Sequence, residues 1–263
     1  MKILPLAQHN VPENFCQQRK MMQQKQPTIE VCFSPRLFDT VLIKGETVVV
    51  VVDILRATTS MVAALNNGAT SVIPHSSLEA VRNLKKQGYL VAAERDGQKL
   101  DFADFGNSAF DFMNADIKGR TIVFSTTNGT VAIETAKKMG QVVIGAFSNI
   151  SALASWLIKQ QKNVVILCSG WQNTFCLEDT IFAGSLTEKL MLENKFMINC
   201  DSAHAALDLW RLSNQDLIGY IQKALHRKRL RKLGMDDVLE YSIKMDTAMI
   251  VPMLMNGVLV DVY

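Results

Sequence analysis

The sequence predicts an α/β protein in which helices cover both faces of a mostly parallel sheet, a layered α/β/α arrangement. Two observations lead to this fold class. From Thr47 onward, short apolar segments alternate with longer segments of helical periodicity. Three of the apolar segments, which begin near Val48, Thr121 and Val164, are each followed by a polar turn and an Ala-rich stretch. Continuous apolar runs of this kind are typical of strands buried on both faces.

The first part of the chain is expected to lie outside this domain. Residues 1–27 include the Gln- and Lys-rich stretch Gln17–Pro27, which predicts an N-terminal extension or a peripheral helix because it has little apolar periodicity. The α/β domain is expected to span residues 28–263. Its composition, 48% hydrophobic and 20% charged residues, suits one large domain or two closely packed halves.

The strands are predicted from apolar runs that end at turn-forming residues. Ser34-Pro35 ends the first run, and Asn256-Gly257 joins the last two into a terminal hairpin. The predicted strands are Ile29–Phe33, Val48–Val52, Ser71–Pro74, Tyr89–Ala93, Thr121–Phe124, Val142–Ala146, Val164–Leu167, Val251–Met255 and Val258–Val262. The stretch Asp96–Asn107, rich in Asp, Gly and Phe, is predicted to be a loop.

The helices are placed by glycine stops and polar caps. Gly68 and Gly88 end the first two helices, and Ser77 begins the second. After Asn199 the pattern becomes helical, which predicts a helical C-terminal segment before the hairpin. The predicted helices are Arg56–Asn67, Ser77–Gly88, a helix that ends at Met139, a helix capped by Ser148-Asn149, Leu177–Glu193, Ser202–Leu212, Asn214–Leu233 and Met235–Met245.

Charge and composition exclude several classes of protein. The 28 basic and 25 acidic residues leave a net charge of +3, too small to indicate a nucleic-acid partner by itself. The basic run His226–Lys232 is interpreted as a solvated helix face, so no nucleic-acid partner is expected. We see no secretion signal and no apolar run near the ~20 residues of a membrane span, so no membrane partner is expected. The five cysteines form no CxxC pair, which favours free thiols in a cytoplasmic protein.

Asp53 directly follows the predicted strand Val48–Val52, and the next helix starts with Arg56, Thr58 and Thr59 nearby. Open α/β sheets bind ligands at the carboxyl ends of their strands, and a helix N-terminus suits phosphate. An acid, a cation and two hydroxyl groups at this place predict a metal-phosphate site. The alternative is that Asp53 supports the turn and that the threonines cap the helix.

Further acids follow other predicted strands, namely Glu94 beside Arg95 and the pair Glu178-Asp179. If the strands are parallel, these acids gather with Asp53 at one edge of the sheet. Carboxylate oxygens without a His or Cys cluster favour a hard cation, Mg²⁺ above all, and arginines would bind charge on the substrate. The alternative for each acid is a helix cap or an ion pair. The four histidines are scattered, and a capping or surface role is expected for each.

A second polar stretch follows the strand Thr121–Phe124. It consists of Ser125, Thr126, Thr127, Asn128 and Gly129. Gly129 permits positive φ, so backbone amides here could curl around an anion, and the alternative is an ordinary turn and helix cap. The same two interpretations apply to Asn107-Ser108. The chain contains no GxxxxGK[ST] and no GxG, which excludes the P-loop and Rossmann fingerprints. Leu55 stands where haloacid-dehalogenase-like phosphatases have a second acid.

Five motifs occur in the order seen in 2-phosphosulfolactate phosphatases. They are DILRATTS (Asp53–Ser60), AERDG (Ala93–Gly97), FGNS (Phe105–Ser108), STTNGT (Ser125–Thr130) and LEDTIFAG (Leu177–Gly184). From about Ile29 to the C-terminal hairpin the chain therefore resembles this family. The resemblance implies a Mg²⁺-dependent phosphatase that hydrolyses 2-phosphosulfolactate to sulfolactate and phosphate, in the biosynthesis of coenzyme M or related sulfonates.

The resemblance also implies roles for individual residues. The implied metal-site candidates are Asp53, Glu94 and the pair Glu178-Asp179, in which Glu178 is taken as the ligand while the sequence leaves open which of the two binds the metal. The implied catalytic residues are Asp53, Arg56, Arg95, Glu178 and Asp179. The implied phosphate and sulfonate pocket consists of Thr58, Thr59, Asn107, Ser108, Ser125, Thr126, Thr127, Asn128 and Gly129. The chain departs from the family pattern at Ala109, at Phe102–Phe105 and at Trp171-Gln172-Asn173, and these departures concern the substrate more than the chemistry.

The expected function is that of a cytoplasmic phosphomonoesterase whose partner is a small anionic phosphate ester. Attack on phosphorus by a metal-activated water and a covalent route through Ser125 or Thr126 are both open. The main alternatives are a small-anion-binding protein without turnover and a phosphatase of a different small phosphorylated acid. The sequence leaves open whether the chain forms a homo-oligomer.

Overall fold

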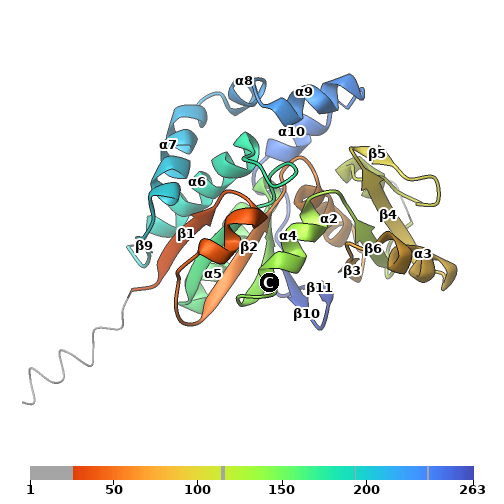
Figure 1. The fold of residues 1–263 in the computed structure, drawn as a ribbon, viewed down its shortest axis with the longest axis horizontal. Coiled ribbons are helices and arrows are strands. Elements are labelled where there is room, and N and C mark those ends of the chain that lie inside the picture. Colours follow the sequence, from red (N-terminus) through yellow and green to blue (C-terminus); the bar gives the residue numbers. More distant parts are fainter. Residues whose placement is uncertain (1–25, 114–115, 193, 236) are drawn as a thin grey trace, which may run out of the picture.

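A single large sheet runs through the computed structural model, which describes residues 26–113, 116–192, 194–235 and 237–263 (Figure 1). The predicted extension, residues 1–27, lies outside the described residues except for its last two. Within them the strand order is β5-β4-β6-β3-β11-β10-β7-β2-β8-β1-β9. The strands are β1 (Thr28–Cys32), β2 (Thr47–Val52), β3 (Ser71–Pro74), β4 (Leu90–Arg95), β5 (Gln98–Lys99), β6 (Thr121–Ser125), β7 (Gln141–Gly145), β8 (Asn163–Cys168), β9 (Met197–Ile198), β10 (Pro252–Met255) and β11 (Val258–Asp261).

Helices cover both faces of the sheet, as predicted. The α-helices are α2 (Ala57–Asn66), α3 (Leu78–Lys86), α4 (Gly129–Ala136), α5 (Ile150–Gln160), α6 (Leu177–Met191), α7 (Asp201–Ser213), α8 (Leu217–Ile221), α9 (Leu225–Lys232) and α10 (Asp237–Ile243). Short 3₁₀ helices, which the sequence analysis did not predict, are η1 (Pro35–Thr40), η2 (Ala109–Phe112) and η3 (Phe147–Asn149).

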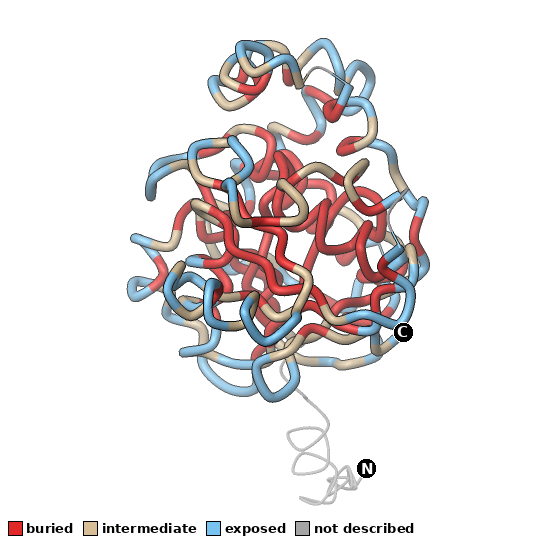
Figure 2. Tube along the Cα trace, turned by 90° about the vertical axis from the view of Figure 1, so that its right-hand side faces the viewer, coloured by how far each residue is buried: buried red, intermediate tan, exposed pale blue. Residues whose placement is uncertain are grey.

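Strand β2 lies at the centre of the core because all six of its residues are buried. Val48, Val50 and Val52 pack in one cluster with α5, α6 and α7, whereas Val49 and Val51 pack in a second cluster with α2 and α4. The alternation of side chains along a strand therefore places consecutive valines in different layers. Figure 2 shows the buried residues concentrated in this interior, and more exposed residues in the helical part at the top of the view.

The sheet consists of two parallel blocks joined by the C-terminal hairpin. Strands β9, β1, β8, β2 and β7 pair in parallel, as do β3, β6 and β4. The predicted hairpin is confirmed: β10 and β11 are antiparallel, and Asn256 and Gly257 both have positive φ in the turn. The hairpin lies inside the sheet, where β10 pairs with β7 and β11 pairs with β3, an arrangement that local patterns do not reveal.

Two predicted elements need correction. The single helix predicted over Asn214–Leu233 is divided into α8 and α9, and Asp216 caps α8 by accepting a hydrogen bond from the Gly219 backbone N–H. The predicted loop Asp96–Asn107 contains β5, which pairs with β4 across a two-residue turn. Asp96 and Gly97 have positive φ in that turn, and Asp-Gly is a strong hairpin signal that the sequence analysis overlooked.

None of the described helices combines the length and apolar character that crossing a membrane requires. The predicted helix Leu177–Glu193 corresponds to α6, and its last predicted residue, Glu193, lies outside the described part of the chain.

Candidate active site

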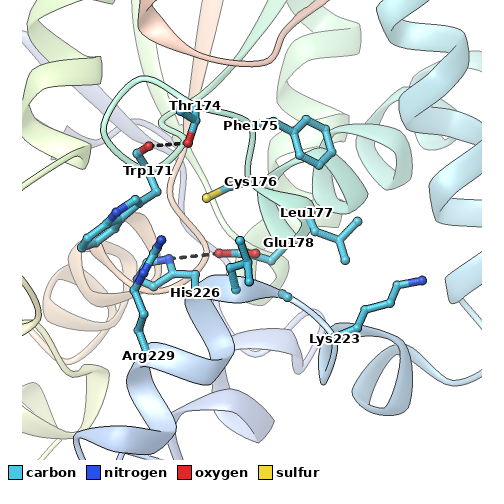
Figure 3. Close-up of a pocket in the computed structure, with 11 residues that line it drawn as sticks. Trp171, Thr174, Phe175, Cys176, Leu177, Glu178, Lys223, His226 and Arg229 are labelled. Atoms are coloured by element: carbon cyan, nitrogen blue, oxygen red, sulfur yellow. Dashed lines mark hydrogen bonds and ion pairs between the residues drawn. The ribbon is translucent and has the colours of Figure 1, made fainter.

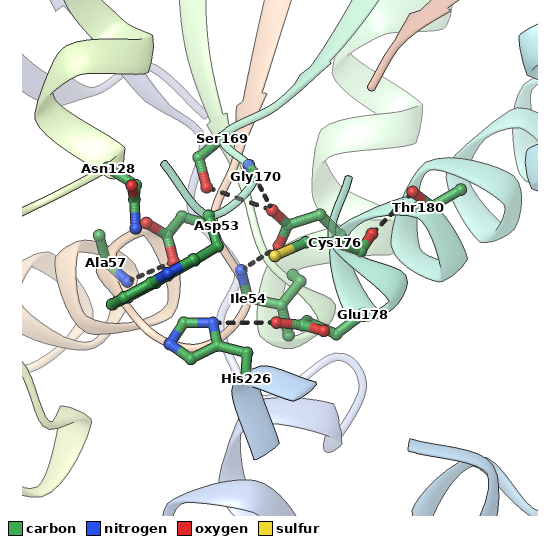
Figure 4. Close-up of polar contacts among 12 residues, drawn as sticks. Asp53, Ile54, Ala57, Asn128, Ser169, Gly170, Cys176, Glu178, Thr180 and His226 are labelled. Carbon is green, nitrogen blue, oxygen red and sulfur yellow. Dashed lines mark hydrogen bonds and ion pairs between the residues drawn. The ribbon is translucent and has the colours of Figure 1, made fainter. Parts of the chain in front are cut away.

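The segments that follow the parallel strands β2, β4 and β8 meet at one edge of the sheet and enclose a small cavity of about 10 Å³. Its wall includes Asp53, Arg56, Glu94, Asn107, Asn128, Trp171 and His226. The prediction that Asp53 and Glu94 flank one common cavity is therefore confirmed. Figure 4 shows Asp53, Asn128, Glu178 and His226 arranged around this point. The volume corresponds to a single water-sized group.

Asp53 is 5% exposed and stands at the end of β2. Its Oδ1 accepts a hydrogen bond of 3.2 Å from the Ala57 backbone N–H at the start of α2. Burial raises the pKa of Asp53 to about 6, since a buried carboxylate loses its hydration. The nearby Glu94 and Glu178 raise this pKa further, while His226 and the Ala57 N–H lower it.

Thr58 and Thr59 shape the turn that carries Asp53. The Asp53 backbone N–H donates to Thr58 Oγ1, and this hydroxyl donates to the Asp53 carbonyl, each at 2.9 Å. The Thr59 hydroxyl donates to the Ile54 carbonyl at 2.9 Å. Both side chains are at most 1% exposed and do not line the cavity. The threonines therefore support the turn and do not cap α2 as the alternative expected, since the N-cap residue of this helix is Arg56.

The carboxylate of Glu94, 4% exposed, is held by the loop after β6 and by the hairpin turn. Its Oε1 accepts from the Thr127 backbone N–H, and its Oε2 accepts from the Gly97 backbone N–H, both at 2.7 Å. The Thr127 hydroxyl donates a third hydrogen bond, at 3.2 Å. Thr127 therefore orients an acid of the site.

The two candidate arginines differ in position. Arg56 lines the cavity, where its guanidinium donates to the Gly97 carbonyl and to Met235 Sδ, both at 2.9 Å. Burial lowers the pKa of Arg56, and the nearby Glu94 and Asp53 oppose that shift. Arg95 lies outside the cavity wall. Its guanidinium donates to the carbonyls of Glu94, Ser125 and Ser76 and to the Ser125 hydroxyl.

The pair Glu178-Asp179 lies in the first turn of α6, and the two side chains have different surroundings. Asp179 Oδ1 accepts from the Ile54 backbone N–H at 2.9 Å. Its Oδ2 accepts from the Gly170 backbone N–H and the Ser169 hydroxyl, both at 3.2 Å. Burial raises the pKa of Asp179 well above its ordinary value, and Asp53 and Glu178 contribute. Asp179 therefore ties the end of β2 to the loop after β8.

Glu178 is 1% exposed, and its Oε1 lies 3.0 Å from Nδ1 of His226 (Figure 4). Its Oε2 has no hydrogen-bond partner among the described residues. The surface or capping role expected for His226 is wrong, because this side chain is 12% exposed and lines the cavity. The sequence carried no signal for it, since His226 lies on α9, far along the chain from the five motifs.

The remaining pocket candidates play mixed roles. Asn128 lines the cavity, and its Oδ1 accepts from the Gln172 backbone N–H at 3.0 Å. Asn107 lines it as well, and its buried Oδ1 has no partner among the described residues. The side chain of Ser125 binds Arg95, and that of Thr126 binds the Thr130 backbone N–H. Neither of these two residues is part of the cavity wall.

Ser108 and Gly129 complete the candidates. Ser108 caps η2 by accepting from the Phe110 backbone N–H, and it lines a neighbouring cavity of about 440 Å³. Gly129 does not use the positive φ expected for it, because it begins α4 with ordinary helical geometry. A Cβ at this position would lie 2.5 Å from Ala57 Cβ and 3.0 Å from Asp53 Oδ2. Glycine is needed here for close approach.

The donor atoms around the cavity suit a hard cation. Glu178 Oε2 and Asn107 Oδ1 are buried oxygens without partners among the described residues. Asn107 lines the small cavity with Asp53 and Glu94, and Glu178 lines the neighbouring cavity that shares His226 with it. Within the described residues, one compact group of metal-ligand side chains is found: Cys176, Glu178 and His226, whose ligand atoms lie within 4.8 Å of one another. Burial raises the pKa of the Cys176 thiol, so this residue is a poor ligand for Mg²⁺, which prefers oxygen.

Comparison with known proteins identifies the family to which the chain belongs. The sequence pattern of the family described as 2-phosphosulpholactate phosphatase matches residues 32–257. A protein of Caldanaerobacter subterraneus subsp. tengcongensis is 35% identical over 214 residues, covering 80% of this chain and 88% of its own. One from Thermotoga maritima is 35% identical over 211 residues (80% and 90%), and one from Prochlorococcus marinus is 38% identical over 221 residues (80% and 89%). Each is described as a probable 2-phosphosulfolactate phosphatase.

Proposed function

Because the chain belongs to the 2-phosphosulfolactate phosphatase family, we propose that it is a phosphoric monoester hydrolase that converts 2-phosphosulfolactate to sulfolactate and phosphate. The observation that supports this chemistry is that Asp53, Glu94 and Glu178 lie with Arg56 at the edge of the sheet where the strands β2, β4 and β8 end. That edge is where open α/β sheets bind their substrates.

The charges of the cavity support the proposal that Mg²⁺ takes part. A dianionic phosphate would be repelled by three neighbouring carboxylates, so a productive complex needs additional positive charge. We propose that Asp53 and Glu178 hold the ion, with Glu94 close by. Among the described residues only one carboxylate oxygen of Asp53 accepts a hydrogen bond from the protein, and Glu178 Oε2 accepts none. A bound Mg²⁺ supplies charge neutralisation and polarises a phosphoryl oxygen.

The protein groups then have separate tasks. Arg56, fixed by the Gly97 carbonyl and by Met235, presents its remaining guanidinium N–H groups to the phosphoryl oxygens and stabilises charge that develops on them. Glu178 fixes the orientation of the His226 imidazole through Nδ1. Glu94 positions the hairpin turn that holds Arg56, through its hydrogen bond with the Gly97 N–H.

The geometry favours direct attack by water over the covalent route through Ser125 or Thr126. Both hydroxyls are hydrogen-bonded within the protein and lie outside the cavity wall. The steric course at phosphorus distinguishes the routes. With a single isomer of a phosphorothioate analogue that carries one ¹⁸O on phosphorus and is hydrolysed in H₂¹⁷O, direct attack gives chiral thiophosphate with inversion. Two displacements through a phosphoenzyme give retention, which would overturn this part of the proposal.

A hydrolysis assay tests the proposed function. The purified protein is expected to release phosphate from 2-phosphosulfolactate and from p-nitrophenyl phosphate with Mg²⁺ present, and to lose this activity in EDTA. Asp53→Asn is expected to lose activity with Mg²⁺, whereas the matched control Asp116→Asn, an exposed acid, retains it. Binding of sulfolactate without hydrolysis of either ester would instead support a small-anion-binding protein.

A further inference from the structure

The outer side of the site carries an arginine that none of the five motifs contains. Arg229 extends from α9 alongside His226, and its Cζ lies 4.2 Å from the centre of the Trp171 ring (Figure 3). Trp171 in turn contacts the His226 ring, with centroids 5.1 Å apart. This stack of Arg229, Trp171 and His226 holds a guanidinium in a defined position at the edge of the carboxylate cavity.

The stack lies between that cavity and open space large enough for a substrate. Trp171 and His226 line the small cavity beside Asp53, and they also line a cavity of about 350 Å³ that Arg229 borders. Arg229, Trp171 and His226 border a third cavity, of about 240 Å³, on the other side. A group of the substrate that occupies either of these larger cavities therefore lies beside Arg229.

No acid among the described residues forms an ion pair with Arg229. Among the described residues no carboxylate lies within 4 Å of its guanidinium, and Asp96, which borders the same cavity, forms no ion pair with it. Lys223, the other basic residue beside the 350 Å³ cavity, lies over the Tyr220 ring, 3.4 Å from its centre. Arg56 lines the small cavity, where it is buried and donates hydrogen bonds to the Gly97 carbonyl and to Met235 Sδ.

We propose that Arg229 is a specificity-determining residue that binds a second anionic group of the substrate while the phosphate lies among the inner residues. This inference rests on the proposed function and deepens it, since it assigns a residue to the further acidic group of the proposed substrate. The planar guanidinium can donate two parallel hydrogen bonds to the oxygens of a sulfonate or a carboxylate. The ring of Trp171 limits the orientations that the guanidinium can adopt.

Substrate discrimination tests the proposal. The ratio of kcat/KM for 2-phosphosulfolactate to kcat/KM for p-nitrophenyl phosphate is expected to fall about tenfold or more in Arg229→Met, the effect of losing one charge-assisted interaction. Arg229→Lys keeps the charge and is expected to recover part of the ratio. Lys228→Met, which removes an exposed charge from the same helix, serves as the matched control and leaves the ratio unchanged.

A third substrate, 2-phospholactate, identifies the anionic group. It keeps the carboxylate and lacks the sulfonate. If Arg229 contacts the sulfonate, the ratio of kcat/KM for 2-phospholactate to kcat/KM for p-nitrophenyl phosphate is expected to stay unchanged in Arg229→Met. A carboxylate contact predicts the same fall for both acids. Equal losses on all three esters, or no loss on any, would overturn the proposal.

Binding without turnover separates this inference from the proposed function. By titration calorimetry, Arg229→Met is expected to bind sulfolactate about tenfold more weakly than the unsubstituted protein, with binding of inorganic phosphate unaffected. If the unsubstituted protein hydrolyses none of the esters, the proposed function fails, and calorimetry still decides the role of Arg229. Equal affinity of both proteins for sulfolactate would refute that role.

Discussion

At the scale of single residues, the site concentrates negative charge where water is scarce. Asp53, Glu94, Glu178 and Asp179 are each at most 5% exposed, and among the described residues the Asp53 carboxylate accepts one hydrogen bond, from the Ala57 backbone N–H. Burial and the neighbouring acids raise the pKa of Asp53 to about 6. Such perturbed groups cluster at functional sites because a reactive or cation-binding group must be kept ready at a cost in stability.

The raised pKa of Asp53 predicts a pH-dependent cost in stability. The unfolded carboxyl ionises near its ordinary pKa of 3.8 and the folded one near 6, so ionisation costs nothing below about pH 4. The cost grows between pH 4 and pH 6 and reaches on the order of 3 kcal/mol above pH 6. Asp53→Asn removes it. In EDTA, this variant is expected to be more stable than the unsubstituted protein at pH 7.5 but not at pH 4, by urea denaturation.

The exposed control Asp116→Asn is expected to show no such pH-dependent gain. An equal stability difference between Asp53→Asn and the unsubstituted protein at both pH values would contradict the raised pKa. Because Asp53→Asn is also expected to be inactive, stability and activity should move in opposite directions at neutral pH, as is common when active-site groups are removed.

Asp179 has a structural task that its neighbour Glu178 lacks. Asp179→Ala leaves the Ile54 and Gly170 N–H groups without their acceptor, and an unmet buried donor costs about 1–3 kcal/mol. The expected loss in the free energy of unfolding is about 2–4 kcal/mol by urea denaturation. Asp179→Asn keeps one carbonyl oxygen and is expected to lose less. Equal stability of the Ala and Asn variants would show that these hydrogen bonds contribute little.

At the scale of elements, the site depends on how closely the first turns of α2 and α4 approach each other. Gly129 begins α4 where a side chain would collide with Ala57 on α2 and press on the Asp53 carboxylate. The Ala-rich start of α2 and the glycine of α4 therefore have one physical reason. Two helix ends that follow different strands must both reach the same cavity, and only small residues leave room.

Gly129→Ala is expected to destabilise the protein by about 1–3 kcal/mol, the cost of overpacking, and to lower kcat/KM because Asp53 is displaced. The second substitution Ala57→Gly removes the atom that lies 2.5 Å from the new Cβ. The double variant is expected to recover part of the stability, measured by thermal denaturation, and part of the activity. A double variant no better than Gly129→Ala would argue against this steric explanation.

At the scale of the whole molecule, the C-terminal hairpin holds two parallel blocks together. Strand β10 pairs with β7 through Met253 and Val143, and β11 pairs with β3 through Leu259 and Val72. The block with β2 and β8 supplies Asp53, Glu178 and Asp179, and the other block supplies Glu94. The cavity therefore lies between residues of the two blocks that the hairpin joins.

Leu259 is fully buried in this junction, and Leu259→Ala is expected to cost about 2–4 kcal/mol in the free energy of unfolding. Met255, on the partner strand and 47% exposed, is the control, and Met255→Ala is expected to change stability by about 0.5 kcal/mol or less. Denaturation in urea measures both. A Leu259→Ala variant as stable as the control would mean that the hairpin contributes little to the junction.

The sequence by itself was sufficient for features that depend on neighbouring residues. The five consecutive valines of β2 predicted a strand buried on both faces, and the polar residues at the ends of β2, β4 and β6 identified strand ends that meet at the cavity. The motifs identified the family, and Asn256-Gly257 identified the terminal hairpin. The roles of the candidate site residues, including the binding of a shared divalent ion, stay predictions.

Only the tertiary structure decided which polar side chains face the cavity and which support the backbone. Thr58 and Asp179 look like site residues in a motif. In the structure Thr58 bonds to the backbone of Asp53, and Asp179 accepts hydrogen bonds from the backbone after β2 and after β8. His226 and Arg229 look like a solvated basic run, yet α9 brings them against Trp171. The physical reason is that side-chain direction and long-range packing depend on residues far apart in the chain, which no local pattern encodes.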